Sequence, residues 1–569
     1  MPSKVEVAKE KSNYLYGTLA QELDKTTSHF EEDNRQVLKF HGIYQQDDRE
    51  QRRERKAAGE EPAYQFMVRS KLPGGALTAE QYLVHDDLAD RYANGTLRIT
   101  TRQGFQFHGV LKGDLKATLR ELNSALVSTL AACGDVERNV MCCPAPTGDP
   151  VRQQLQQLAR AIAAHLEPRT RAYHKIWLNG EEVKFADDGR DEEPVYGKTY
   201  LPRKFKTAVA YPGDNCVDVL TNDLGLIAVL DQTGTRIKGY TLVVGGSMGT
   251  THGKEETFPA LARPIGFVRP EDAIKAAEAV VIVQRDYGDR NNRRHARLKY
   301  LIHDRGLAWF RERVEEVFGR PLEDPRPLPP FETHDHLGWG ESADGTLWLG
   351  LPIENGRVAD IGHRRLRTSL RRLVETYRPR IFLTPQHNIL LVGLDPANRV
   401  AIEFELFQHG IATVNDISGV RRHEMACPAL PTCGLAIAEA ERVLPDVIDQ
   451  LEWELEQLGL GDETISIRMT GCPNGCARPY VAELAFVGRS LNKYQILVGG
   501  DFNGMRLNVL YADLVHLEDL AATVRPLLAL WRDWRRPGEG FGDFTARLGV
   551  DALRSYANEW KTAQASQAA

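Results

Sequence analysis

The chain of 569 residues is 42% hydrophobic and 26% charged, with a net charge of −6 and eight cysteines. At about 150 residues per domain, this length predicts three or four domains with an ample core. The mild negative charge argues against a general nucleic-acid binder, and no apolar run approaches the roughly 20 residues that a membrane span needs. Because the first residues are polar and lack an apolar signal core, a cytoplasmic location is expected.

The first 60 residues are polar and rich in charge, ending in the run Gln45–Arg55. We expect an extended arm and a charged helix with little core of their own, available for docking a partner. From residue 61 onward, strand-like segments alternate with helical ones. Thr78 is predicted to cap a helix that runs to Ala93, and Leu97–Val110 alternates as one strand.

Short segments of the first half recur in the same order in the second half, which indicates an internal repeat. The matching pairs are Phe66–Gly75 with Leu347–Gly356, Leu97–Gly109 with Ile381–Gly393, and Leu242–Gly246 with Ile496–Gly500. Each copy begins as strand, helix, strand and continues into a longer helix and a mixed sheet. The sequence therefore predicts an α+β protein of two related halves, with a pseudo-twofold axis and a cavity between them.

Four cysteines in the last quarter of the chain form two pairs, Cys427-x5-Cys433 and Cys472-x3-Cys476. Four thiolates make a complete ligand set for one [4Fe–4S] cluster. The surrounding Pro and Gly residues favour loops whose N–H groups turn toward sulfur. A zinc site and buried apolar cysteines are the alternatives, although zinc usually takes pairs two to four residues apart.

Disulfides are not expected, because cytosolic thiols stay reduced. A helix over Gly434–Leu458 is predicted to point its positive end at the cluster. The other four cysteines have no evident ligand pairing and are expected to be small core residues: Cys133, Cys142, Cys143 and Cys216.

Basic residues in strand-like or turn contexts form a second group: Arg69, Arg98, Arg102, Arg138, Arg203, Lys204 and Lys206. Residues two apart share one face of a strand, which groups Lys204 with Lys206 and Arg98 with Arg102. For any single one, a solvated charge run is the alternative. Together they suit an anionic ligand, because Arg grips oxyanions at two points and Lys also donates a proton. The sequence has no nucleotide-binding motif, so electrons are expected to arrive from another protein.

The segment Thr470–Cys476, with the upstream Cys-x5-Cys, resembles the siroheme and [4Fe–4S] signature of sulfite and nitrite reductases. Motifs along nearly the whole chain resemble the hemoprotein (beta) subunit of assimilatory sulfite reductase. They include HGIYQQDDR at His41, TRQGFQFHG at Thr101, YLPRKFKT at Tyr200 and GEGFGDFT at Gly538.

The resemblance implies five segments, namely an arm followed by two copies of a two-part unit. They are a polar N-terminal arm over 1–60, a ferredoxin-like half-domain over 61–150, a siroheme domain over 151–335, a second ferredoxin-like half-domain over 336–420, and a [4Fe–4S]/siroheme domain over 421–569.

The resemblance also implies roles for the candidate residues. Cys427, Cys433 and Cys472 hold only the cluster, and Cys476 bridges it to the siroheme iron as axial ligand. The residues implied to hold the macrocycle are Arg98, Arg102, Gln106, His108, Arg203 and Asn474, with Arg297 and Lys299 as weaker candidates. Those implied to bind and protonate the substrate are Arg69, Arg138, Lys204 and Lys206.

The activity implied is the six-electron reduction of sulfite to sulfide at siroheme iron, for cysteine biosynthesis. Nitrite reduction to ammonia and a non-catalytic metal-binding scaffold are the alternatives, and Lys204-Phe-Lys206 favours sulfite. The form of Gln45–Arg49 resembles the subunit that works with an NADPH-oxidising FAD/FMN flavoprotein, and ferredoxin is the other candidate donor. Some relatives carry a Tyr–Cys crosslink near the active site, for which Tyr44 and Cys133 are the candidates here.

Overall fold

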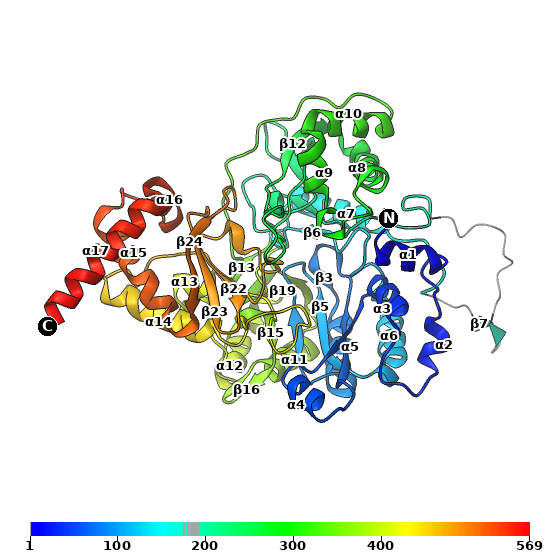
Figure 1. The fold of residues 1–569 in the computed structure, drawn as a ribbon, viewed down its shortest axis with the longest axis horizontal. Coiled ribbons are helices and arrows are strands. Elements are labelled where there is room, and N and C mark those ends of the chain that lie inside the picture. The colour runs from blue at the N-terminus through cyan, green and yellow to red at the C-terminus, as the bar shows by residue number, and fades with distance from the viewer. Residues whose placement is uncertain (1, 174–176, 179–180, 183–192, 569) are drawn as a thin grey trace.

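The computed structural model describes residues 2–173, 177–178, 181–182 and 193–568. Four five-stranded sheets organise the fold, two in ferredoxin-like half-domains and two in larger mixed domains (Figure 1). In the part of the chain so described, no helix combines the length and the apolar character that crossing a membrane requires.

The first half-domain is an antiparallel sheet in the order β1-β2-β5-β4-β15. Its own strands and helices are β1 (Ile43–Asp47), β2 (Tyr64–Arg69), β4 (Leu97–Ile99), β5 (Phe105–Val110), α5 (Ala79–Tyr92) and α6 (Leu115–Ser124). Thr78 caps α5 as predicted, because its side chain accepts from the Gln81 N–H and the Gln81 side chain accepts from the Thr78 N–H.

The second half-domain repeats this sheet in the order β13-β14-β19-β18-β3. Its own elements are β13 (Gly338–Glu341), β14 (Leu347–Leu351), β18 (Arg380–Leu383), β19 (Ile389–Leu394), α11 (Leu366–Tyr377) and α12 (Arg399–Gln408). Each half-domain completes the sheet of the other, since β15 (Arg357–Val358) pairs with β4 and β3 (Ala76–Leu77) pairs with β18. Buried side chains of both halves, such as Phe66 and Leu391, belong to one hydrophobic core.

The two mixed domains share one strand order, β6-β9-β10-β11-β12 in the first and β20-β21-β22-β23-β24 in the second. The strands of the first are β6 (Met141–Cys142), β9 (Thr207–Ala210), β10 (Leu224–Leu230), β11 (Ile237–Val244) and β12 (Arg263–Val268). Those of the second are β20 (Glu424–Ala426), β21 (Ile467–Thr470), β22 (Leu484–Ser490), β23 (Lys493–Val498) and β24 (Val509–His516). In each sheet the first three strands pair in parallel, and the fourth strand pairs antiparallel with both the third and the fifth. The shared pattern confirms the internal repeat.

Helices cover these sheets. In the first mixed domain they are α7 (Pro150–His165), α8 (Ala273–Tyr287), α9 (Leu298–Arg305) and α10 (Leu307–Phe318). In the second they are α14 (Leu444–Gln457), α15 (Leu520–Trp534), α16 (Phe541–Leu548) and α17 (Val550–Ala568), and Figure 1 shows α17 extending to the C-terminal end of the molecule.

The N-terminal 60 residues are more ordered than the expected arm. They form α1 (Lys4–Lys11), α2 (Leu19–Leu23), α3 (Glu32–Leu38), β1 and α4 (Arg52–Ala57). Leu15, Val37 and Phe40 join the core of the first mixed domain, so scattered apolar residues suffice to anchor this polar stretch. Only the short α4, which buries no residue, matches the expected exposed charged helix.

Two other expectations are wrong in detail. Leu97–Val110 is not one strand, because a turn over residues 100–104 separates β4 from β5, with Gln103 at a φ of 55°. Arg98 and Arg102 therefore do not share a strand face. The helix expected directly after Cys433 begins only at Leu444, so its positive end does not follow that cysteine.

Candidate active site

Two loops of the second mixed domain hold the four predicted cysteines. Cys427 directly follows β20, and Cys472 comes two residues after β21, which runs parallel to β20. Because the carboxyl ends of neighbouring parallel strands meet at one edge of a sheet, both loops start there. The Gly471 N–H donates toward Cys427 Sγ at 3.5 Å, and the Cys427 N–H donates to Met469 O at 3.2 Å.

The thiols of these loops lie close enough to affect one another's ionisation. Burial raises the pKa of Cys427, and the thiols of Cys476 and Cys472 raise it further. Burial and the Cys476 thiol likewise raise the pKa of Cys472 to about 12. Grouped thiolates are unfavourable without a cation, whereas an iron–sulfur cluster takes four of them. The donor set therefore fits a [4Fe–4S] cluster.

Cys476 is the exposed member of the set, and two lysines of the first mixed domain interact with it. Lys204 and Lys206 lie half-buried just before β9, and the fully buried Phe205 separates them. Burial holds the pKa of both lysines well below its usual value, and the nearest cations, Arg203 for Lys204 and Lys204 for Lys206, lower it further. Cys476 acts on both in the opposite direction, so the thiol and the amines share one site.

Arg69 and Arg138 extend this cationic group. Arg69 Nη1 lies 3.0 Å from Cys133 Sγ, and its Nε donates to the Gln106 amide oxygen at 3.1 Å once that amide is oriented to suit both groups. Arg138 donates to two backbone carbonyls, and Tyr44 lies beside it. Burial raises the pKa of Tyr44, as does Cys133.

Within the described residues, none of the four cations Arg69, Arg138, Lys204 and Lys206 forms an ion pair with a carboxylate, although Asp135 lies near enough to raise the pKa of Arg138. Arg69 and Arg138 bond to sulfur, amide and carbonyl groups, which are neutral partners or a thiol. Partly desolvated cations without a paired anion are costly. A bound oxyanion would remove that cost, so the arrangement fits the predicted anionic ligand.

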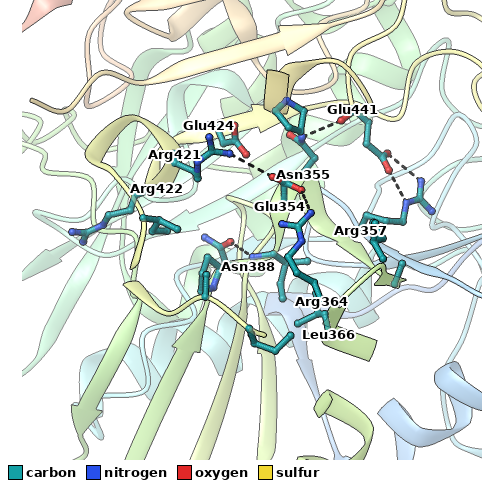
Figure 2. Close-up of a pocket in the computed structure, with 18 of the residues that line it drawn as sticks. Glu354, Asn355, Arg357, Arg364, Leu366, Asn388, Arg421, Arg422, Glu424 and Glu441 are labelled. Atoms are coloured by element: carbon teal, nitrogen blue, oxygen red, sulfur yellow. Dashed lines mark hydrogen bonds and ion pairs between the residues drawn. The ribbon is translucent and has the colours of Figure 1, made fainter. Parts of the chain in front are cut away.

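Arg98 and His108 belong to a closed network around Glu441. Arg98 Nε donates to the Glu441 carboxylate at 2.9 Å, and Arg357 Nε donates to it at 2.6 Å. Arg357 Nη1 lies 3.3 Å from His108 Nδ1, and burial followed by Arg357 holds the pKa of His108 far below its usual value. Figure 2 shows Glu441 meeting Arg357 and Asn355. All three line a cavity of about 350 Å³, whose lining includes none of the four cysteines.

The other macrocycle candidates lie nearer the cysteines and lysines. Arg102 donates to Asn222 Oδ1 at 2.7 Å, while its buried Nε has no hydrogen-bond partner among the described residues. Among the residues that the structure describes, the one carboxylate contact of Arg203 is with Asp135, at 3.8 Å. Asn474 Nδ2 lies 3.3 Å from Cys472 Sγ. An unpartnered guanidinium N–H and a weakly paired one fit a macrocycle that carries carboxylates.

The two weaker candidates are engaged elsewhere. Arg297 pairs with Asp223 at 2.7 Å. Lys299 donates to backbone carbonyls of Ser247, at 3.2 Å, and Gly249, at 2.7 Å. Lys299 therefore supports the loop after β11 and Arg297 the residue just before β10, and a direct contact of either with a cofactor stays a prediction.

Comparison with known proteins follows the same division of the chain. Residues 58–125 match the nitrite/sulfite reductase ferredoxin-like half domain, and residues 158–322 match the nitrite and sulphite reductase 4Fe-4S domain. The sulfite reductase [ferredoxin] of Synechococcus elongatus is 47% identical over 98% of this chain and 91% of its own. The sulfite reductase [NADPH] hemoprotein beta-component of Geobacillus kaustophilus is 46% identical over 96% of each chain.

The chain belongs to the nitrite and sulfite reductase family. The solved structure of the Mycobacterium tuberculosis NirA protein has the same fold, with a TM-score of 0.78 and 25% identity over 97% of this chain and 98% of that one. Family membership confirms the predicted fold class and the expected cofactors, siroheme and a [4Fe–4S] cluster. The matched 4Fe-4S domain falls on the first copy, while the four predicted cysteines lie in the second.

Sequence reasoning missed two groups that position this site. Glu441 joins Arg98 to Arg357, and nothing in its local sequence distinguishes it from a surface carboxylate. Asp218 accepts from Arg468 at 2.8 Å and also pairs with Arg478. A signal was present for this second pair, because Asp218 and Arg478 each lie two residues after a cysteine, Cys216 and Cys476.

Proposed function

We propose that this protein is a siroheme-dependent sulfite reductase, which reduces sulfite to sulfide with six electrons. The observation that carries the proposal is the group of four cations without carboxylate partners beside the exposed Cys476 thiol. Sulfite has one more oxygen and more negative charge than nitrite, so four cations suit it better. Both curated relatives described above are named sulfite reductase.

The cofactors would occupy the residues already described. Siroheme, when bound, supplies the iron that takes the substrate, with electrons delivered through the [4Fe–4S] cluster. Cys427, Cys433, Cys472 and Cys476 would hold the cluster, and Cys476 would also ligate the siroheme iron. The residues proposed to hold the macrocycle are Arg102 and Arg203 by charge, with Arg98, Gln106, His108 and Asn474 around them.

The substrate-side residues would divide the work between binding and proton supply. Arg69 and Arg138 keep their charge and can hold sulfite oxygens at fixed positions. Lys204 and Lys206 have pKa values well below the usual value, through burial and neighbouring cations, so they release protons more readily than exposed lysines. Each S–O bond that breaks leaves an oxygen that needs protons, and these amines are placed to give them.

The test is sulfide formation by the purified protein with reduced methyl viologen, beside ammonia formation from nitrite. We expect a higher kcat/KM for sulfite. A higher kcat/KM for nitrite would overturn the substrate assignment. A non-catalytic scaffold would show neither product and no visible siroheme absorbance.

We propose an NADPH-oxidising flavoprotein as the electron donor, supported by the name of the Geobacillus relative and by the form of Gln45–Arg49. Arg49 Nη1 donates to Cys433 O and Gly434 O, both at 3.1 Å, so this segment lies on the loop that carries a cluster ligand. The exposed α4 follows it directly. Turnover with the flavoprotein and NADPH, and none with reduced ferredoxin, is the expected result; the reverse would favour ferredoxin, the donor printed in the name of the Synechococcus relative.

We also propose that Tyr44 and Cys133 form a covalent crosslink. Both raise the pKa of the same arginine, Arg138, and Cys133 raises the pKa of Tyr44, so the two side chains are neighbours. An intact mass lower by about two daltons than the sequence mass supports the crosslink. A full sequence mass, or alkylation of Cys133 in the denatured protein, contradicts it.

A further inference from the structure

The first mixed domain has its own version of the two cluster-binding loops. Cys143-Pro follows β6 as Cys427-Pro follows β20. Cys216 lies six residues after β9, as Cys476 lies six residues after β21. β6 and β9 are parallel neighbours, as β20 and β21 are, so both loops again leave the same sheet edge. Two of the four cluster thiols therefore have counterparts in the first copy.

Two further donor side chains join these thiols. Asp214 precedes Cys216 in the same loop, and His336 comes from the connection between α10 and β13. One donor atom from each of Cys143, Asp214, Cys216 and His336 lies within 4.8 Å of the others. Cys143, Asp214 and Cys216 are buried, and His336 is half-buried.

The spacing of these atoms matches a tetrahedral site. Asp214 Oδ2 lies 3.1 Å from Cys143 Sγ and 3.4 Å from His336 Nε2, and the Cys143 to His336 distance is 3.6 Å. Zinc bonds of about 2.0–2.3 Å put the corners of a tetrahedron about 3.3–3.8 Å apart. The donor atoms thus stand close to the positions that a central ion would require.

We propose that Cys143, Asp214, Cys216 and His336 bind one Zn²⁺. Two sulfurs, one imidazole nitrogen and one carboxylate oxygen are ligand types that zinc takes in closed, four-coordinate structural sites. The site has two thiols in place of four, so it does not offer the ligand set of a [4Fe–4S] cluster.

Charge in the site balances with the metal bound. Two thiolates and one carboxylate carry three negative charges, which one Zn²⁺ and the Arg152 guanidinium cancel. Arg152 Nη1 lies 2.7 Å from Cys143 Sγ and 3.2 Å from Asp214 Oδ2, so it donates to two ligands from outside the metal shell. Without the ion, Arg152 and a protonated His336 are the cations that face Asp214 and the thiols.

Other contacts fix the ligands in place. The Cys216 N–H donates to Asp214 Oδ1 at 3.1 Å, which leaves Oδ2 for the ion. Gln156 Nε2 donates to Cys143 O at 3.0 Å, and Gln386 Nε2 of the second half-domain donates to Cys216 O at 2.7 Å. Such support from the surroundings is usual for metal ligands.

The ion would fasten the connection between the two copies. Residues 319–337 link α10 to β13 with almost no regular structure, touching the first copy through a bridge of Glu332 to Asp214. His336 sits at a φ of 56°, a left-handed conformation that is uncommon outside glycine and in which Asn, Asp and His are the enriched side chains. A metal bond at His336 would hold this connection on the first mixed domain, away from the reaction site.

The test is metal analysis of the holoenzyme purified without chelators and then exposed to Zn²⁺ and desalted. We expect about one zinc per chain beside about five iron atoms. Zinc-edge X-ray absorption should show two sulfurs at about 2.3 Å and two lighter atoms at about 2.0 Å. Less than about 0.1 zinc per chain, or a disulfide between Cys143 and Cys216 in a non-reducing peptide map, would overturn the proposal.

Variants locate the ion. His336→Asn keeps a residue that tolerates this backbone and should bring zinc below about 0.1 per chain, as should Cys216→Ala, with visible cofactor spectra unchanged. The matched controls are His334→Asn, on the same connection but exposed, and Cys142→Ala, next to Cys143 but in the apolar core. Both controls should keep one zinc. Equal zinc in His336→Asn and wild type would contradict the site, even if either variant loses thermal stability.

Discussion

Arg138 in the first copy and Arg422 in the second occupy matching positions, each five residues before the Cys-Pro that follows a parallel strand. Their surroundings differ. Arg422 Nε donates to the Asp335 carboxylate at 2.7 Å, and the adjacent Arg421 pairs with Glu452 at 2.6 Å. Arg138 forms no ion pair among the described residues: it donates to two backbone carbonyls, and Tyr44, Cys133 and Asp135 lie near enough to raise its pKa. One backbone frame thus holds a neutralised arginine in one copy and an uncompensated one in the other.

The loops that carry the cysteines differ between the copies in the opposite sense, because here the second copy has the larger set of thiols. The second copy has four thiols after β20 and β21, whereas the first has two thiols, a carboxylate and a histidine from the interdomain connection. The copies meet where Asp218 pairs with Arg468 and Arg478. The turn of each half-domain also bonds the cysteine carbonyl of the opposite copy, Thr101 to Cys476 at 3.0 Å and Gln386 to Cys216 at 2.7 Å.

The proposed reaction requires groups that carry electrons and a site that holds the anion, and these two requirements fall to different copies. The second copy supplies thiolates that would hold the electron-carrying groups, and the first supplies cations that would hold the anion. The pseudo-twofold contact brings the two specialised faces together, so neither copy alone contains the site.

The largest expected effect comes from removing Cys476, the thiol proposed to bind both the cluster and the siroheme iron. Cys476→Ser should lose siroheme and all sulfite turnover, because a serine hydroxyl is a poor replacement for an axial thiolate. The visible spectrum of the purified variant and an iron count measure this. A variant replete with siroheme would contradict the axial role of Cys476.

Removing one substrate-side cation should cost about 10²–10³-fold in kcat with methyl viologen, the usual loss when one preorganised charge is removed. Lys204→Ala is the test, with iron and siroheme content measured to show that both cofactors remain. Lys204→Arg should recover binding better than turnover, since arginine keeps the charge but does not give up a proton. Full activity of Lys204→Ala would refute its assignment.

Breaking the network around Glu441 should affect stability more than chemistry. Glu441→Gln leaves the buried Arg98 without its counter-charge, a change that costs about 3–5 kcal/mol in buried pairs. We expect a lower Tm and a smaller loss of kcat than in Lys204→Ala. An unchanged Tm would show that the network around Glu441 does not stabilise the fold.

Because of Glu441, the unfolding free energy is also expected to depend on pH. Burial acts to raise the pKa of Glu441, but Arg98 and Arg357 outweigh it and bring the pKa to about 2. A carboxyl with a lower pKa in the folded state stabilises the fold fully above its unfolded value, about 4.3, and loses this stabilisation as pH falls toward 2. The difference in unfolding free energy between wild type and Glu441→Gln should therefore shrink between about pH 4 and pH 2.

The smallest effect is expected at the exposed α4 near the cluster loop. Reversing two charges in Arg53→Glu/Lys56→Glu should slow turnover with a protein donor several-fold, in a salt-dependent way, because rim charges mainly affect association rates. Turnover with methyl viologen should not change. Equal rates with the protein donor would remove α4 from the docking surface.

Much of the fold was predictable from the sequence, because short similar segments recur in the same order in both halves. Phe66–Gly75 and Leu347–Gly356 do take the same place, in β2 and β14. The exchange of β3 and β15 between half-domains was not predictable, since two-residue strands leave no periodic signal. The turn after Ile99 was missed because Arg98, Thr100 and Arg102 alternate in sequence as a strand would.

The candidate site was predictable where a motif is dense, as at Cys472–Cys476, and less so where partners are distant in sequence. Glu441 decides what Arg98 touches, yet the two residues are 343 positions apart. Cys143 and Cys216 are buried in a hydrophobic cluster, as predicted. The donor groups beside them, Asp214 and His336, could not be predicted, because His336 is distant in sequence and only the fold brings it close.

The central claim is that the uncompensated cations of the first copy form the anion site while their neutralised counterparts in the second do not. The most direct measurement is kcat/KM for sulfite, with reduced methyl viologen, in Arg138→Ala beside Arg422→Ala. We predict a loss of at least about 100-fold in Arg138→Ala, with both cofactors retained, and a change of less than about threefold in Arg422→Ala. Equal losses in the two variants, or a larger loss in Arg422→Ala, would contradict it.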